Sequence, residues 1–77
     1  MDIKEFISNF ADQFDDLDSA ALAPETEFMS LNEWNSLVAL SVIAMIDEEY
    51  DVTLKGGDIR EAKTIEDLYK TVCEKME

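Results

Sequence analysis

Ser36 is the side chain in this sequence whose position most directly indicates chemistry. Its hydroxyl follows a polar stretch that ends at Asn35 and precedes a long apolar segment that begins at Leu37. A serine at the start of a helix is usually only a cap. The start of a helix also offers free backbone N–H groups and a positive dipole end, which stabilise an attached phosphate. Ser36 is therefore a candidate attachment point for a phosphodiester-linked group.

Catalysis by the chain itself is poorly supported. The sequence has no histidine, and neither Ser36 nor Cys73 lies beside a lysine that could act as the base. Pairs of carboxylates abound, but in so acidic a chain they do not indicate acid–base catalysis. The single cysteine cannot form an internal disulfide, which suits a reducing compartment. We interpret Cys73 as a thiol of the last helix without a catalytic role, and we expect that the protein is not an enzyme.

Metal binding is also weakly indicated, although acidic residues cluster at two places. Asp12, Asp15, Asp16 and Asp18 do not have the alternating spacing and central glycine of a calcium loop. The acids at positions 47–49 are consecutive on a predicted helix and so point away from one another. Both clusters are better interpreted as solvated acidic faces, and a metal-buffering domain is the weakest of the functions that we consider.

Length and charge restrict the possible partners. The 77 residues make one small domain, at positions 1–77, and nineteen acidic against six basic residues give a formal charge of -13. This charge disfavours nucleic acid and either steers the protein toward basic patches on partners or serves only solubility. The longest apolar run, Leu37 to Ile46, is shorter than the ~20 residues of a membrane span, and the first residues do not resemble a secretory signal. We therefore expect a cytoplasmic protein without membrane contact.

An amphipathic helix is predicted from Asp2 to about Phe14. Asp2 is its expected N-cap, with Glu5 completing a capping-box pattern. The apolar residues recur at spacings of three and four and so share one face: Ile3, Phe6, Ile7, Phe10 and Phe14.

The stretch from Asp15 to Asn35 has no helical periodicity and is long for a connection in a small domain. A short helical turn is expected within Leu17–Ala23. Isolated apolar residues predict an ordered loop that is pinned to the core: Leu17, Leu22, Phe28, Met29, Leu31 and Trp34.

The second helix is expected from Ser36 or Leu37 to Tyr50 and is apolar nearly all round. Such a helix is either buried or presents its second face to a partner, and we favour the partner because so short a chain can hardly bury a whole helix. The residues expected to face the core are Ala39, Val42, Ile43, Ile46 and Tyr50. Those on the opposite side are Leu37, Ser41, Ala44 and Glu48, with Val38 and Met45 on one edge and Leu40 and Asp47 on the other.

The remaining elements are short. Gly56 and Gly57 are expected to break the chain, and a short helix or turn follows from about Asp58 to Ala62. Its apolar residue, Ile59, can fold back with the glycines toward Ser36. The last helix is expected to start at a Thr64 cap with acids in its first turn, and its apolar stripe comprises Ile65, Leu68, Tyr69, Val72 and Met76. Three main helices and one short helix around one core predict an all-α bundle.

Three motifs stand in register along this chain. Trp34 to Leu37 begins the second helix, Ile46 to Val52 ends it with acids followed by an aromatic and a β-branched residue, and Ala62 to Leu68 enters the last helix. With these motifs, the length, element order and charge of essentially the whole chain resemble an acyl carrier protein or a peptidyl carrier domain. The first motif is similar to the family's Asp-Ser-Leu hallmark and to the Trp-Asp-Ser-Leu variant of stand-alone carriers.

The resemblance implies a four-helix carrier bundle with a long first loop. It implies that a phosphopantetheinyl transferase attaches 4'-phosphopantetheine from coenzyme A to Ser36, and that the thiol of this arm delivers acyl or aminoacyl groups as thioesters to loading and processing enzymes. The residues expected around the attached group are Asn35, Leu37 and Ile59. The second helix would be the recognition surface of a monomer, and the contact residues carried over by position are Leu37, Val38, Ser41, Met45 and Glu48.

The sequence departs from the family pattern in two ways. Asn35 stands where the family has aspartate; it caps a helix about as well, but the missing charge weakens docking of the transferase. Val38, Ser41 and Ala44 stand where fatty-acid-type carriers tend to show acids, so docking would depend more on apolar burial, at ~25 cal/mol per Å². These features are typical of a dedicated carrier of a specialised pathway, such as polyketide or nonribosomal peptide synthesis. The alternative is an unmodified carrier-like module that docks partners through the second helix.

Overall fold

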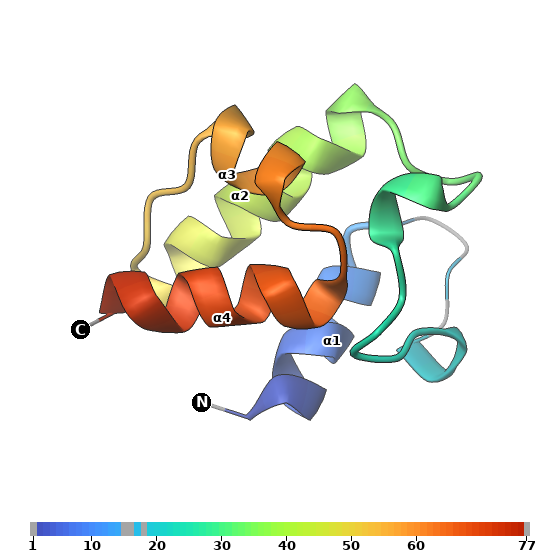
Figure 1. The fold of residues 1–77 in the computed structure, drawn as a ribbon, viewed down its shortest axis with the longest axis horizontal. Helices are drawn as coiled ribbons and strands as arrows, with labels where there is room; N and C mark the ends of the chain where they lie inside the picture. Colours follow the sequence, from blue (N-terminus) through green and yellow to red (C-terminus); the bar gives the residue numbers. More distant parts are fainter. Residues whose placement is uncertain (1, 15–16, 18, 77) are drawn as a thin grey trace.

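The computed structural model describes residues 2–14, 17 and 19–76, and these residues form helices, turns and loops without a strand (Figure 1). This confirms the predicted all-α fold with three main helices and one short one. The α-helices and 3-10 turns, in chain order, are α1 (Ile3–Ala11), η1 (Ser19–Ala21), η2 (Phe28–Ser30), α2 (Ser36–Tyr50), α3 (Gly56–Glu61) and α4 (Ile65–Met76).

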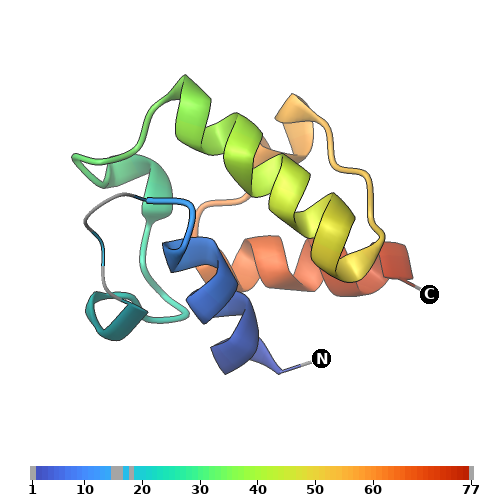
Figure 2. The same cartoon turned by 180° about the vertical axis from the view of Figure 1, so that it is seen from behind.

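The helices α1, α2 and α4 pack against one another, and α3 packs on α4. Figure 2 shows the end of α2 in front of α4 and α1 below α2, with the described residues of the long connection between α1 and α2 at one side of the bundle. Phe6 of α1 joins the three long helices, because its ring lies 5.7 Å from the ring of Tyr50 and 5.5 Å from that of Tyr69. The largest fully buried side chains are Phe6, Phe10, Phe28, Val42, Ile46, Ile65, Leu68 and Val72. No helix in the described residues is long and apolar enough to cross a membrane.

The first helix begins where the sequence predicts and ends earlier. The Asp2 carboxylate accepts a hydrogen bond from the backbone N–H of Lys4 at 3.0 Å, as expected of an N-cap. The helix ends at Ala11 rather than near Phe14, since the N–H groups of Gln13 and Phe14 bond to carbonyls only three residues back, at Phe10 and Ala11. These shorter bonds tighten the chain into a turn, and Phe14 remains buried after it.

The long connection is pinned to the core as predicted, with one exception. Its helical turn η1 lies within the expected range, Leu22 and Phe28 are buried, and Leu17, Leu31 and Trp34 pack against the core. The expectation that Met29 anchors the loop is wrong, because its side chain is 38% exposed. Two backbone hydrogen bonds tie this loop to the start of α4, from Ile65 N–H to Thr26 at 3.1 Å and from Glu66 N–H to Pro24 at 2.8 Å.

The second helix has the predicted bounds, and its burial differs from the helical-wheel expectation at one residue. Val42 and Ile46 are buried, while Ala39, Ile43 and Tyr50 are half-buried, as expected of its core face. Met45 is also buried, with 5% exposed, because the end of α1 lies beside it. Its predicted role as a partner contact is therefore not supported.

The glycine pair belongs to α3 instead of breaking the chain before it. Gly56 and Gly57 form the first turn of this helix, and neither has a positive φ. The extended residues before them bury Val52 and Leu54. The helix can then start at once, because the N–H of Lys55 donates to the Asp58 carboxylate at 2.9 Å.

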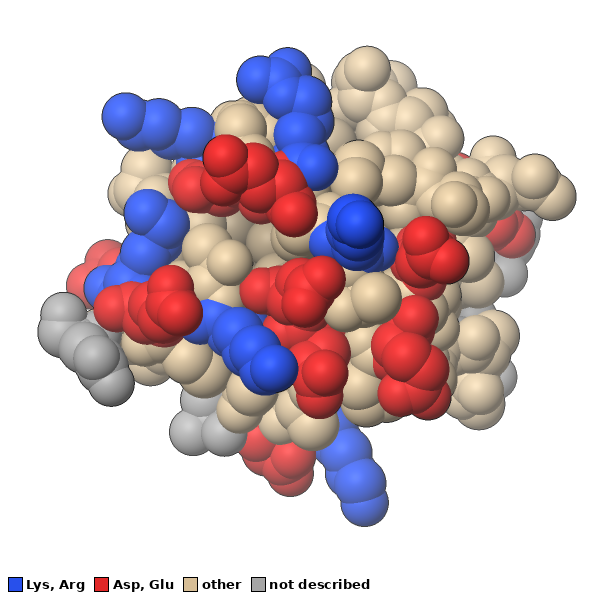
Figure 3. All heavy atoms as spheres, viewed as in Figure 1, with Lys and Arg blue, Asp and Glu red and all other residues tan. Residues whose placement is uncertain are grey.

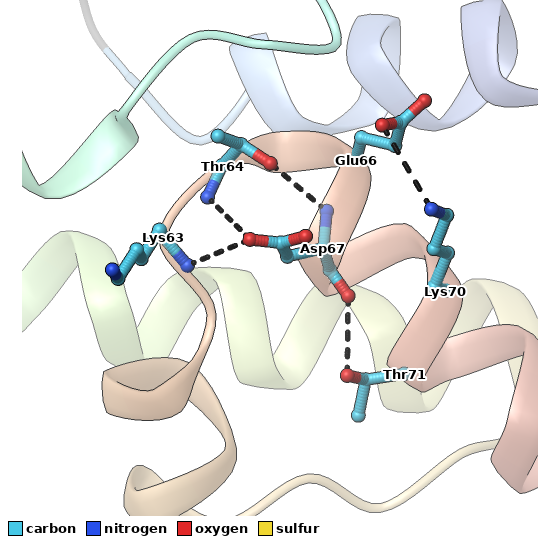
Figure 4. Close-up of polar contacts among 6 residues, drawn as sticks. All are labelled: Lys63, Thr64, Glu66, Asp67, Lys70 and Thr71. Atoms are coloured by element: carbon cyan, nitrogen blue, oxygen red, sulfur yellow. Dashed lines mark hydrogen bonds and ion pairs between the residues drawn. The ribbon is translucent and has the colours of Figure 1, made fainter.

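The start of α4 is closed by a reciprocal pair of side chains (Figure 4). The Thr64 hydroxyl oxygen accepts from the Asp67 N–H at 3.1 Å, and the Asp67 carboxylate accepts from the N–H groups of Lys63 at 3.2 Å and Thr64 at 3.3 Å. These backbone hydrogen bonds, Lys63 first, lower the pKa of Asp67. The predicted Thr64 cap is confirmed. At the other end of α4, Met76 is 49% exposed and does not belong to the buried stripe.

Candidate attachment site at the start of α2

Ser36 is the first residue of α2 and is exposed. The residue before it, Asn35, has an extended backbone and is the N-cap, with its side-chain oxygen accepting from the Val38 N–H at 3.0 Å. The Ser36 hydroxyl is therefore not the helix cap. Within the described residues, the backbone N–H groups of Ser36 and Leu37 have no acceptor. The start of α2 thus presents one hydroxyl and two free N–H groups at the positive end of the longest helix.

Aromatic packing holds this helix start in place. Trp34, two residues before Ser36, stacks on Phe10 with ring centres 6.3 Å apart and an interplanar angle of 4°. Its ring also meets the edge of Phe28 at 5.0 Å and lies 6.3 Å from Phe14. Because Phe10 and Phe28 are fully buried, the core itself fixes where Asn35 and Ser36 emerge.

Ser36 borders an open pocket of about 480 Å³ between α2, α3 and the loop that precedes α2. Gly56 and Ile59 of α3 line the same pocket, as the sequence predicted, and Ile59 is buried. Asn35 lines it as well. The other apolar walls are Met29, Trp34, Ala39, Leu40 and Ile43.

The charge of this pocket differs from that of the rest of the chain. Within the described part of the chain, no acidic residue lines it, and its one charged lining residue is Arg60 of α3, although the sequence has nineteen acids. Figure 3 shows an uncharged patch around the start of α2, with basic side chains over α3 beside it. Sequence reasoning singled out Ile59 but missed Arg60, because adjacent residues of a helix normally face directions ~100° apart.

The predicted partner contacts on α2 divide into two groups. Leu37, Ser41 and Glu48 are exposed, with Leu37 at 76%, and Val38 is half-buried against the core, whereas Met45 is buried as described above. Leu40 was assigned only to the edge of this helix by the sequence, yet it is 63% exposed and forms an apolar surface with Leu37. The exposed face of α2 therefore runs along the whole helix, with the large apolar side chains Leu37 and Leu40 in its first half and acidic residues at positions 47–49.

The described residues that the sequence suggested for metal binding or for a reactive thiol do not line this pocket. The described residues contain no group of three potential metal ligands. Asp15, Asp16 and Asp18 of the predicted solvated cluster lie outside the described residues. Cys73 is half-buried on α4 and does not line the pocket beside Ser36.

A small helical domain with an exposed serine at the start of its longest helix has the arrangement expected of a carrier domain. The chain matches the family model described as a phosphopantetheine attachment site over residues 5–72, and it therefore belongs to this family. Domains of this family hold covalently bound 4'-phosphopantetheine, are typically non-catalytic carriers, and generally interact with phosphopantetheinyl transferases and processing enzymes. Neither the curated proteins nor the solved structures give a significant match to the chain.

Proposed function

We propose that Ser36 carries the 4'-phosphopantetheine group and that the protein transports acyl or aminoacyl intermediates as thioesters on it. The observation that carries this proposal is the free hydroxyl of Ser36, exposed at the start of α2 and not used as a cap. It lies within the span that matches the phosphopantetheine family. Among the residues that the structure describes, no other serine begins an α-helix.

The residues around Ser36 suit the group. In the attachment step, the Ser36 oxygen forms a bond to phosphorus while the phosphoanhydride bond of coenzyme A breaks, which releases adenosine bisphosphate and the proton of the serine. The N–H groups of Ser36 and Leu37, which have no acceptor within the described residues, would be available to the new phosphodiester. The apolar wall at Ile59 offers a surface for the arm. When bound, the group supplies the terminal thiol on which a thioester forms.

The exposed first half of α2 is the surface on which we propose that the transferase and the loading and processing enzymes dock. Leu37 and Leu40 provide exposed apolar area, and Ser41 and Glu48 extend the surface along the helix. Because this surface has few charges, apolar burial contributes most of the affinity, which fits a carrier dedicated to one specialised pathway. We further propose a monomer that works in the cytoplasm, where its lone cysteine stays reduced.

The test is the intact mass of the protein after incubation with coenzyme A, magnesium and a broad-specificity transferase. The wild type should gain one phosphopantetheine, and Ser36→Ala should gain none while keeping its helical circular dichroism. Ser8→Ala is the matched control, since it removes an exposed serine of α1 that lies outside the proposed docking surface. It should be modified like the wild type.

Asn35→Asp separates two reasons for a negative result. If only this variant gains the mass, the scaffold is a carrier whose asparagine impairs recognition by that transferase. Absence of modification in the wild type, Ser8→Ala and Asn35→Asp alike would contradict the proposal, as would modification of Ser36→Ala.

A further inference from the structure

Arg60 is the feature of the pocket that the attachment role alone does not explain. It is exposed on α3 and lines the pocket that Ser36 borders. Neither ion pair in the described part of the chain, Lys70 with Glu66 and Lys75 with Asp58, involves it. In a chain with a formal charge of -13, Arg60 thus has no ion pair within the described residues and lines the pocket beside the candidate attachment point.

The start of α2 adds to the positive field of this arginine. Among the four α-helices of the described residues, α1, α3 and α4 each carry an acidic residue in the first turn, and α2 carries none. Asn35 keeps the cap neutral as well, and the N–H groups of Ser36 and Leu37 have no acceptor within the described residues. Among the described residues, the lining of the pocket thus offers an anion the Arg60 side chain and the start of α2 at Ser36, and it includes no carboxylate.

We propose that Arg60 binds the phosphodiester attached to Ser36 and thereby holds the arm in the pocket between α2 and α3. This inference rests on the proposed function. The phosphodiester is the anion nearest to Ser36, because its phosphorus is bonded to the serine oxygen. Beyond it, the arm has a dimethyl-substituted carbon that suits the apolar walls at Trp34, Ile43 and Ile59. Arg60 is a positioning residue in this role and takes no part in the chemistry of the thiol.

The expected strength of this contact is modest. Arg60 is exposed, so its attraction to the phosphodiester is weakened by water and salt, and removing it should reduce the docked population about threefold. A guanidinium presents a planar fork to phosphate oxygens, whereas an ammonium acts as a point charge. Lysine at this position should therefore restore part of the docking.

The experiment compares the wild type with Arg60→Gln, Arg60→Lys and Lys63→Gln. The last is the matched control, because Lys63 is an exposed base three residues away that does not line the pocket. Each protein is first modified to completion with coenzyme A and a transferase, and intact mass verifies the added group. The ³¹P chemical shift of the phosphodiester and the emission of Trp34, the single tryptophan, then report docking.

We expect the wild type and Lys63→Gln to share one ³¹P shift and one change in Trp34 emission on modification. Arg60→Gln should move the ³¹P shift toward that of the same phosphodiester in the urea-unfolded protein and lose most of the emission change. Arg60→Lys should be intermediate, and added salt should reduce the difference between wild type and Arg60→Gln. Equal ³¹P shifts in wild type and Arg60→Gln would overturn the inference and leave the attachment proposal standing. No mass gain in the wild type would instead indicate failure of the attachment proposal.

A second part of the experiment distinguishes between two anions that Arg60 could bind, the phosphodiester and a carboxylate of the cargo. The same proteins are loaded with a neutral acetyl or with a succinyl group, whose free carboxylate is a second anion on the arm. Docking that depends on Arg60 equally in the free-thiol, acetyl and succinyl forms supports the phosphodiester. Dependence on Arg60 in the succinyl form alone would overturn this assignment, because Arg60 would then bind the carboxylate of the cargo and not the phosphodiester.

Discussion

The first turns of α4 and α2 differ in how their backbone N–H groups are satisfied. At the start of α4, the N–H groups of Ile65 and Glu66 donate to the loop carbonyls of Thr26 and Pro24, and that of Asp67 donates to the Thr64 hydroxyl. At the start of α2, the Asn35 side chain accepts only from the Val38 N–H. The N–H groups at the start of α4 thus find acceptors within the protein, whereas the start of α2 leaves N–H donors and a hydroxyl exposed to solvent.

The distribution of charge follows the same division. The first turn of α4 carries Glu66 and Asp67, which compensate the positive end of the helix dipole. The first turn of α2 has no acid, and the nearby charged residue in its pocket is Arg60. In a chain with nineteen acids, we take this difference to mean that α4 is built for stability and that α2 is left open for an added anion.

The two helix starts are also anchored by different forces. Hydrogen bonds to the loop hold α4, whereas the packing of Trp34 on Phe10 and Phe28 holds the residues before α2. The site therefore depends on the aromatic core more than on its own polar contacts. Substitutions in the aromatic core should displace the start of α2, and substitutions of polar residues near Ser36 should not.

The largest effect is expected from Phe28→Ala, which removes a fully buried ring from beneath Trp34. The lost burial and the cavity should reduce the free energy of unfolding by about 3–5 kcal/mol. That is a large part of the roughly 4–12 kcal/mol expected for a chain of this length. Urea denaturation followed by Trp34 emission measures the loss. Met29→Ala is the control, and its half-exposed neighbouring side chain should change stability by less than about 0.5 kcal/mol.

A smaller effect of opposite sign is expected from Leu37→Glu, which gives α2 the first-turn acid that the other helices have. The carboxylate should stabilise the unmodified protein by about 0.5 kcal/mol through the helix dipole, since Leu37 is largely exposed and little burial is lost. The same charge should slow modification of Ser36, because it opposes the incoming phosphate. Denaturation and the rate of mass gain test both parts. Ala44→Glu, an acid on the exposed middle of α2, should give neither the dipole stabilisation nor a comparable slowing; equal effects would refute the comparison.

The smallest expected effect concerns pH at the completed helix start. The Lys63 and Thr64 N–H groups lower the pKa of Asp67, so folding favours its ionised form. This stabilisation is present above the ordinary aspartate pKa of about 4 and is lost as pH falls through the lower folded-state value. The stability difference between wild type and Asp67→Asn should therefore be constant from neutral pH to about pH 5 and shrink below about pH 4. Thr64→Ala retains the carboxylate, and its stability should still depend on pH in this range.

The sequence was sufficient to predict the helices and the candidate serine, because periodicity and capping residues are local signals. Thr64 and Asp67 illustrate this, since their contacts join residues only three positions apart. It was not sufficient to predict the burial of Met45 or the position of Arg60. Met45 belongs to the buried core and lines a pocket with residues from the end of α1, and Arg60 lines the pocket beside Ser36 because of where α3 lies, so both depend on how distant segments are placed.

The placement of the helix ends has a practical consequence. The first turn of α1 and the last turn of α4 both lie on the side of the bundle away from the first turn of α2 (Figures 1 and 2). A flexible tether attached at either end would therefore leave the serine facing outward, with a free path for a visiting enzyme. The domain could therefore be immobilised on a solid support or fused to a synthase through such a tether. It would then rotate freely about the attachment point and could present Ser36 to several neighbouring enzymes in sequence.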